Sequence, residues 1–363
     1  MCNGTCDGLL FSLACWINWL RLKLVSTSEI LRIRPVPDAL HLTIHPSQFP
    51  DVERAALIDG LTNRCVDPRL LYQSPLQSAR WLKVFERWAP FVNREDCRAI
   101  YRRSSERAAA DLAGEVAVIA LGCGDGSKDM QLLEELNRSG ANLRFVPLDV
   151  SAALVTRASL AARKFVSSER IHPIVADLAR ANDLSNWLDD RLPPVGGRIF
   201  TFYGMIPNFE PLGILPVLAN LLRPGDRMLF SVNLAPGNDL DESVNRILPQ
   251  YDNPETRAWL MTLLEENGVA ANSGELKFSV EPGPELDELR RIVARFHFVG
   301  DTTLKIGGTA FRYPANTDLR MFFSYRYSVQ QIERLLVRFR MQPLKSWITN
   351  NGEEGVFLCS AET

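Results

Sequence analysis

The chain has 363 residues, of which 46% are hydrophobic and 23% charged, a composition that excludes intrinsic disorder and permits a sizeable core. Its formal net charge of −2 excludes the broad basic field that attracts nucleic acid. The seven cysteines form no CxxC pair and the four histidines do not fall at metal-ligand spacing with them. We therefore expect a soluble protein of a reduced, cytoplasmic compartment, with no metal site and no nucleic-acid partner.

Residues 1–75 are predicted to be an irregular N-terminal extension. Five prolines fall within the first 70 positions and discourage long regular elements. Residues 9–20 are apolar, but this run is too short to span a bilayer. We therefore expect no membrane span, and we expect the apolar run to dock on protein or on a surface.

A helical pattern begins at residue 76. Trp81, Phe85 and Trp88 follow one another at i, i+4 and i+7, which predicts one apolar stripe on a helix that ends near Pro90. A second helix is expected over residues 96–112.

Five short apolar runs then alternate with helical segments. Continuous apolar runs of this length are typical of strands buried on both faces, and strand–helix alternation predicts a parallel sheet with helices on both sides. The five strands are expected at residues 116–122, 143–150, 171–178, 198–205 and 226–234.

The alternation stops after Pro236. Residues 238–316 are predicted to form an α+β insertion, a lid on the substrate side, with one helix near residues 285–294. Strands at residues 319–327 and 354–361 would complete a seven-stranded sheet. The predicted fold is therefore α/β, a doubly wound and mostly parallel sheet, with a core of residues 76–237 and 317–363.

The first strand runs into the sequence LGCGDGSKD. Gly122 and Gly124 at this point allow a tight turn and let the backbone approach a ligand closely. Dinucleotide-binding folds have the spacing GxGxxG, whereas the third glycine here, Gly126, comes one residue early. This spacing favours a nucleoside without a pyrophosphate, such as S-adenosylmethionine. The alternative is a plain tight turn with no ligand.

Polar side chains follow the next three strands. Asp149 ends the second strand, where a carboxylate can accept hydrogen bonds from both ribose hydroxyls, and Asp177 ends the third, where adenine would lie. Helix capping is the alternative for both. Tyr203 and Asn208, in FYGMIPNFE after the fourth strand, are expected at the rim of the same site. For Asn208 the alternative is a turn in which its amide bonds its own backbone.

Five segments together resemble the histidine-specific methyltransferase family, whose founding member makes trimethylhistidine. They are, in chain order, LGCGDGSKD, FVPLDVS, FYGMIPNF, LPQYDNPE and MFFSYRYS. The resemblance runs from about residue 70 to the C-terminus and implies a Rossmann-like class I fold with S-adenosyl-L-methionine as cofactor. It also implies cofactor contacts at Gly122, Lys128, Asp149 and Asp177.

The same resemblance implies a substrate site. Asn208 and Tyr251 match residues that hold the substrate and are expected to be catalytic, with Tyr251 orienting the amine or taking part in its deprotonation. Ser324 matches a late serine of the substrate site, and Tyr72 matches a tyrosine that closes over it.

Two positions depart from the family pattern. Pro207 replaces a glycine, and Phe322 stands where a glutamate would hold the imidazole of histidine. A site in which a phenyl ring replaces this carboxylate cannot keep the same preference for an imidazole. We therefore expect Phe322 to line an apolar substrate pocket and histidine not to be the substrate. The expected activity is N-methylation of a small amine or α-amino acid with a larger apolar or aromatic group. A non-catalytic cofactor- or partner-binding module, a small-molecule O-methyltransferase and a dehydrogenase are the alternatives.

Overall fold

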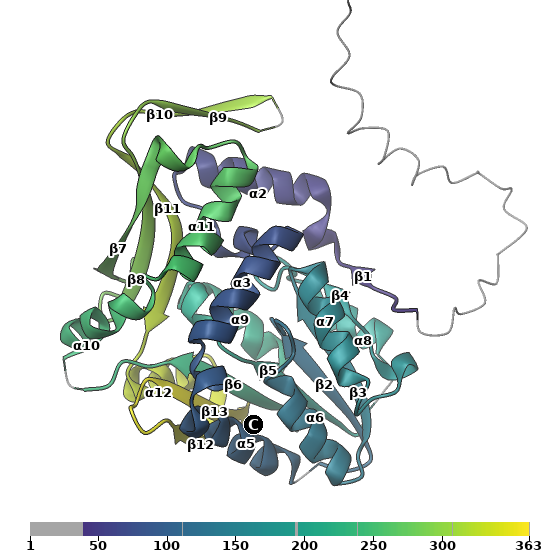
Figure 1. Cartoon of the computed structure of the whole chain (residues 1–363). Helices are drawn as coiled ribbons and strands as arrows, with labels where there is room; N and C mark the ends of the chain where they lie inside the picture. The colour runs from purple at the N-terminus through teal and green to yellow at the C-terminus, as the bar shows by residue number, and fades with distance from the viewer. Residues whose placement is uncertain (1–38, 111, 193–194, 238, 307, 363) are drawn as a thin grey trace, which may run out of the picture. The chain divides into compact units, whose positions relative to one another are not determined.

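A computed structural model of the chain describes residues 39–110, 112–192, 195–237, 239–306 and 308–362 (Figure 1). From Leu40 onward these residues form one unit around an eight-stranded sheet, in the order β1-β4-β3-β2-β5-β6-β13-β12. The neighbours from β1 to β6 pair in parallel, whereas β13 is antiparallel to both β6 and β12. The strands of this central sheet are β1 (Thr43–Ile44), β2 (Glu115–Leu121), β3 (Asn142–Asp149), β4 (Ile174–Val175), β5 (Gly197–Phe202), β6 (Arg227–Asn233), β12 (Met341–Ile348) and β13 (Glu354–Ala361).

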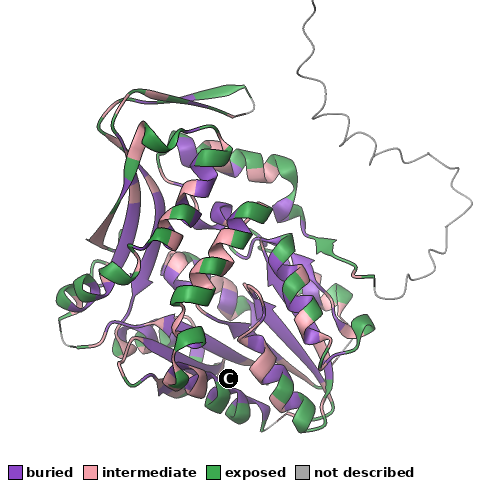
Figure 2. Cartoon of the chain, viewed as in Figure 1, coloured by how far each residue is buried: buried purple, intermediate pink, exposed green. Residues whose placement is uncertain are grey.

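Helices cover both faces of the central sheet. One apolar cluster joins one face of the sheet to α5, α6 and α7, and a second joins the other face to α8, α9 and α12. The inner strands β2, β3, β5, β6 and β13 are buried on both faces for this reason, as Figure 2 shows. The prediction of a doubly wound, mostly parallel α/β fold is therefore confirmed. These helices are α5 (Glu95–Ala109), α6 (Asp129–Arg138), α7 (Ala152–Ala162), α8 (Leu184–Arg191), α9 (Pro211–Leu221) and α12 (Val329–Arg338).

A second, three-stranded antiparallel sheet lies beside the first, in the order β11-β8-β7, and a hairpin of β9 and β10 extends from it (Figure 1). Helices α2 and α11 share an apolar cluster with this sheet, and α3 packs along α11. The strands are β7 (Gly274–Pro282), β8 (Arg290–Phe298), β9 (Thr302–Ile306), β10 (Thr309–Tyr313) and β11 (Thr317–Arg326). The helices are α2 (Pro50–Thr62), α3 (Pro75–Trp88), α4 (Pro90–Asn93), α10 (Leu240–Ile247) and α11 (Pro254–Glu266). Short 3-10 turns complete the fold: η1 (Pro46–Gln48), η2 (Pro68–Leu71), η3 (Ser168–Arg170), η4 (Ile206–Asn208), η5 (Leu248–Gln250) and η6 (Ala271–Ser273).

Three predictions about elements are wrong. The strand expected at residues 319–327 is not a strand of the central sheet: β11 pairs with β8, and β12 supplies the edge strand beside β13. No helix forms near residues 285–294: the second half of this range begins strand β8, because pairing with two neighbouring strands overrides its local helical spacing. Residues 39–75 are not irregular, since Pro50 begins helix α2 at a position where a missing N–H costs nothing.

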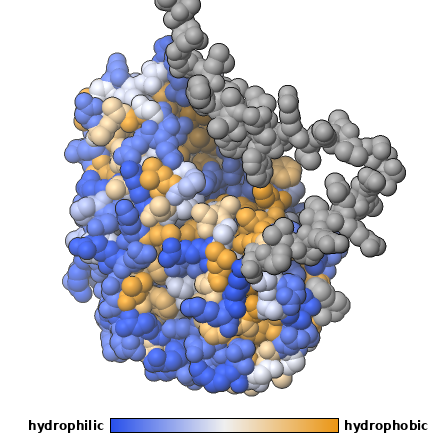
Figure 3. Space-filling view, turned by 45° about the vertical axis from the view of Figure 1, so that its right-hand side comes forward, coloured by the Kyte–Doolittle hydropathy of each residue, from blue (hydrophilic) through white to orange (hydrophobic). Residues whose placement is uncertain are grey.

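Most of the face seen in Figure 3 is hydrophilic, with hydrophobic patches between hydrophilic residues. In the part of the chain that the structure describes, no helix is long and apolar enough to cross a bilayer. The apolar run at residues 9–20, which we expected to dock on a surface, lies outside the described residues.

Candidate active site

The turn that follows β2 depends on its glycines. Gly122 and Gly124 have positive φ angles of 66° and 53°. A Cβ atom on Gly122 would lie 2.5 Å from the side chain of Met205, and one on Gly124 would lie 3.0 Å from the ring of Trp81. Any larger residue would therefore strain the backbone and close the space above the turn.

Asp149, at the carboxyl end of β3, is joined to this turn. Its Oδ2 accepts a hydrogen bond from the Gly124 N–H at 3.0 Å, and its Oδ1 accepts one from the Ser151 N–H at 3.0 Å. Ser151, rather than Asp149, is the N-cap of α7, because its hydroxyl accepts the Leu154 N–H. Burial raises the pKa of Asp149 to about 6. The carboxylate thus lies beside the glycine turn with its remaining lone pairs available to a ligand.

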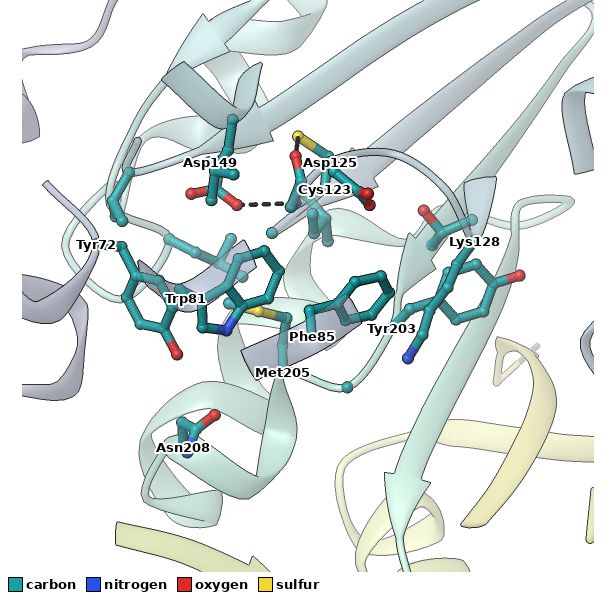
Figure 4. A pocket seen from close by; sticks show the side chains of 18 of the residues that line it. Tyr72, Trp81, Phe85, Cys123, Asp125, Lys128, Asp149, Tyr203, Met205 and Asn208 are labelled. Carbon is teal, nitrogen blue, oxygen red and sulfur yellow. Dashed lines mark hydrogen bonds between the residues drawn. The ribbon is translucent and has the colours of Figure 1, made fainter. Parts of the chain in front are cut away.

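A cavity of about 250 Å³ opens at these strand ends, where parallel α/β sheets bind their ligands. Figure 4 shows Asp149 on one side of it and Lys128 and Tyr203 at one end. The cavity brings together eight of the residues that the sequence singled out: Tyr72, Gly122, Gly124, Lys128, Asp149, Asp177, Tyr203 and Asn208.

Asp177 lies at one end of the cavity and is not free. Its Oδ2 forms an ion pair of 2.9 Å with the Arg69 guanidinium, and its Oδ1 accepts the Ala179 N–H at 3.0 Å. Burial raises the pKa of Asp177, and the positive charge of Arg69 opposes that shift. Arg69 also lines the cavity. Arg69 was not predictable from the sequence, because η2 carries it to the end of β4 from more than 100 positions upstream and no local pattern marks it.

Lys128 belongs to a buried polar cluster at the opposite end. Its Nζ donates a hydrogen bond of 2.9 Å to the Tyr101 hydroxyl and lies 3.7 Å from Oε1 of Glu354. Tyr101 in turn donates to Glu354, and burial raises the pKa of Tyr101 well above its ordinary value. A cation held in this way is suited to an anionic group of a ligand at this end.

Three aromatic rings form a wall of the cavity. The Trp81 ring stacks on Phe85 at 5.5 Å between centroids and meets Tyr72 edge-on at 5.8 Å (Figure 4). A capping box of Ser74 and Gln77 fixes the start of α3, which carries Trp81 and Phe85. The helical stripe in the sequence predicted that these side chains share a face, but it did not predict that the face lies over a ligand cavity. Such rings are suited to a positively charged sulfonium or ammonium group.

The expected substrate residues gather around β11. The Asn208 amide donates to the backbone oxygen of Phe323 at 2.7 Å, so its Oδ1 is left to accept a hydrogen bond; it does not bond its own backbone. The Tyr251 hydroxyl lies 2.9 Å from the Ser324 hydroxyl. Phe322 is 5% exposed and meets the Trp259 ring edge-on at 5.6 Å.

A second cavity of about 220 Å³ adjoins the first and shares with it Trp81, Phe85, Asn233 and Glu354. Tyr251 and Arg326 line it. Phe322 and Ser324, expected to contact the substrate, line neither cavity in the described part of the chain: Phe322 packs behind Tyr251, and Ser324 reaches the site through the Tyr251 hydroxyl. Within the described ranges, no group of three or more His, Cys, Asp or Glu side chains could hold a metal ion.

Comparison with known proteins identifies the family that the chain resembles. The profile of the family described as "Histidine-specific methyltransferase, SAM-dependent" matches residues 53–361. The Histidine N-alpha-methyltransferase of Mycobacterium tuberculosis is 30% identical over 221 residues, which are 60% of this chain and 62% of that protein. The Histidine N-alpha-methyltransferase of Mycolicibacterium smegmatis is 30% identical over 166 residues, 45% of this chain and 47% of that protein. The chain therefore spans less than two thirds of the length of the curated relatives it matches.

Among solved structures, the 1,6-didemethyltoxoflavin-N1-methyltransferase of Burkholderia thailandensis is 12% identical. The match covers 79% of this chain and 88% of that chain with a TM-score of 0.39.

Proposed function

The chain belongs to the histidine-specific, S-adenosylmethionine-dependent methyltransferase family, and we propose that it methylates the nitrogen of a small amine or α-amino acid. The observation that carries the proposal is the hydrogen bond between the Gly124 N–H and the Asp149 carboxylate. It joins a glycine turn and a buried acid at one edge of a doubly wound sheet, beside a cavity walled by aromatic rings.

The residues around the first cavity fit S-adenosylmethionine, which supplies an activated methyl group when bound. Gly122 and Gly124 leave backbone surface open where a Cβ would fill the space. Asp149 would accept the ribose hydroxyls, and Asp177, paired with Arg69, would meet the adenine. At the other end, Lys128 would pair with the carboxylate of the cofactor, and Tyr203 would line the cavity beside it.

Asn208 and Tyr251 are the residues we propose to act on the amine. The free Oδ1 of Asn208 accepts a hydrogen bond from the amine and turns its lone pair toward the methyl group. Tyr251, held by Ser324, fixes the other side of the amine and assists its deprotonation. Tyr72 closes the site as a neutral phenol, since burial and the nearby Asp149 carboxylate raise its pKa. These residues contribute to catalysis largely by positioning the amine in line with the methyl group.

The proposed substrate carries an apolar or aromatic side chain rather than an imidazole. The family resemblance implies a glutamate at position 322, and a phenylalanine stands there instead. Phe322 packs behind Tyr251, with 6.4 Å between the ring centroids, and against Trp259 at 5.6 Å, so the side chains behind Tyr251 are aromatic and not carboxylate. These apolar surroundings of Tyr251 favour an apolar group of the substrate and offer an imidazole N–H no carboxylate acceptor. We further propose that the insertion of residues 238–316 is the substrate-side unit of the protein.

A methyl-release assay with labelled S-adenosylmethionine tests the proposal. The methyl acceptors to be tested are three amino acids (tryptophan, phenylalanine and histidine) and two amines (tryptamine and phenethylamine). A catechol serves as the oxygen acceptor. Methylation of an aromatic amino acid or amine at nitrogen, with histidine the poorer substrate, is the expected result. S-adenosylhomocysteine binding without turnover on any compound would favour a non-catalytic module, and transfer to the catechol alone would favour O-methylation.

A further inference from the structure

Arg326 is a buried arginine without a counterion. Three arginines are buried in the described ranges, namely Arg69, Arg291 and Arg326, each 6% exposed. Arg69 pairs with Asp177 and Asp67, and Arg291 pairs with Glu210 at 3.0 Å. Arg326 forms no ion pair with any described carboxylate.

Neutral groups alone hold the Arg326 guanidinium. One terminal nitrogen donates to the backbone oxygens of Leu234 and Glu353 at 3.1 and 3.3 Å, and the other donates to the Tyr251 hydroxyl at 3.0 Å. Its Nε is buried and has no hydrogen-bond partner among the described residues. A buried cation that lacks an anion is costly for a fold to keep, so this arrangement suits a site whose anion arrives with a ligand.

Arg326 lies where a ligand can reach it. With Tyr251 it lines the second cavity, which adjoins the cofactor cavity at Trp81, Phe85 and Asn233. Two carboxylates also line the second cavity and are engaged elsewhere. Glu354 accepts hydrogen bonds from Tyr101 and Cys97, and Glu353 accepts one from Gln250 at 3.2 Å.

Strand β11 carries Arg326, where an anion would bind, and contacts the residues proposed to hold the amine, Asn208 and Tyr251. The Phe323 backbone oxygen holds Asn208, the Ser324 hydroxyl holds Tyr251, and Arg326, two residues further along, holds the same Tyr251 hydroxyl. A group bound by Arg326 and a group bound by Asn208 are thus positioned by one strand.

We propose that Arg326, with Tyr251, binds the carboxylate of the substrate in the second cavity, and that it makes the enzyme select an α-amino acid over the corresponding simple amine. This inference rests on the proposed function, because it places the carboxylate beside the amine to be methylated. Truncating one partner of a desolvated charge pair weakens binding by about 30-fold or more.

Binding to the S-adenosylhomocysteine-loaded protein, measured by calorimetry, tests the inference without turnover. The probes are three matched pairs, each an amino acid and its carboxamide: phenylalanine, tryptophan and histidine against their amides. Wild-type protein should bind the preferred amino acid about 30-fold more tightly than its amide. Arg326→Gln should remove this difference, and Arg326→Lys should restore part of it, which a merely structural role would not do. Arg312→Gln, an exposed position on β10, is the matched control.

The wild-type comparison stands even if Arg326→Gln does not fold. Equal binding of amino acid and amide, or no binding of either in any pair, overturns the inference. Turnover is measured separately with labelled S-adenosylmethionine. A strong carboxylate preference without methylation of any probe would overturn the proposed function and leave the anion site standing.

Discussion

The Oδ2 atom of Asp149 lies 3.0 Å from the backbone nitrogen of Gly124, 25 positions earlier in the chain. This hydrogen bond joins the carboxyl ends of β3 and β2, which pair in parallel over their whole length. It fixes the acid against the turn that a nucleoside ligand would occupy, so the two parts of the proposed cofactor site form one rigid unit.

Gly124→Ala should damage both the fold and the cofactor site. An L-residue at its φ of 53° is strained by about 1–2 kcal/mol, and the new Cβ would press on Trp81 at 3.0 Å. We expect a lower free energy of unfolding in denaturant titrations and at least a tenfold loss of affinity for S-adenosylhomocysteine. The matched control is Gly213→Ala in α9, where a Cβ meets open space; alanine should stabilise that helix by about 0.5–1 kcal/mol. Equal cofactor affinity in the two variants would contradict the role of the turn.

Cofactor affinity should depend on pH through Asp149. Burial raises the pKa of this carboxyl to about 6, and ribose hydroxyls bind best to its ionised form. Lowering the pH from 7 to 5 should therefore weaken S-adenosylhomocysteine binding about tenfold. The free energy of unfolding of the free protein should depend on pH in the opposite direction. Because the pKa of Asp149 is higher in the folded than in the unfolded chain, this group lowers the stability as the pH rises from about 4 through 6. Binding by Asp149→Asn should lack the step. A step that persists there belongs to another group, such as Asp129, which lines the same cavity and whose pKa burial raises to about 7.

Phe322→Glu should move substrate preference toward histidine. The new carboxylate would offer an acceptor to the imidazole N–H and would place a charge beside Trp259, at some cost in stability. We expect the ratio of kcat/KM for histidine to that for the best aromatic substrate to rise at least tenfold. Phe322→Leu keeps the site apolar and should leave histidine poor. If both variants change the ratio alike, Phe322 does not govern the choice of side chain.

The alternating strands of the central sheet were predictable because each is a short apolar run buried on both faces. The edge strand β12 was not, since its sequence MQPLKSWI is largely exposed and contains Pro343. The apolar residues around 285–294 are compatible with a helix and with a strand. Pairing of β8 with β7 and β11 decides in favour of the strand. Local sequence thus determined the elements that are apolar throughout, and tertiary contacts determined the rest.

The candidate site divides in the same way. Gly124, Asp149 and Asp177 were predictable because the ends of parallel strands meet at one edge of the sheet. Arg69 and Arg326 were not, because each comes from a segment whose place depends on packing between elements distant in sequence. Trp81 was predictable in part: the sequence indicated its place on a helix, but not that it lines a cavity.

The central claim is that the glycine turn and the Asp149 carboxylate together bind an adenosyl cofactor, and calorimetric titration of Asp149→Ala with S-adenosylhomocysteine tests it most directly. Asp190→Ala, an exposed position on α8, is the control. Wild-type and Asp190→Ala proteins should bind equally well, and Asp149→Ala should bind at least 30-fold more weakly, since it loses charge-assisted hydrogen bonds to two hydroxyls. Equal affinity in all three proteins, or no binding by the wild type, would contradict the claim.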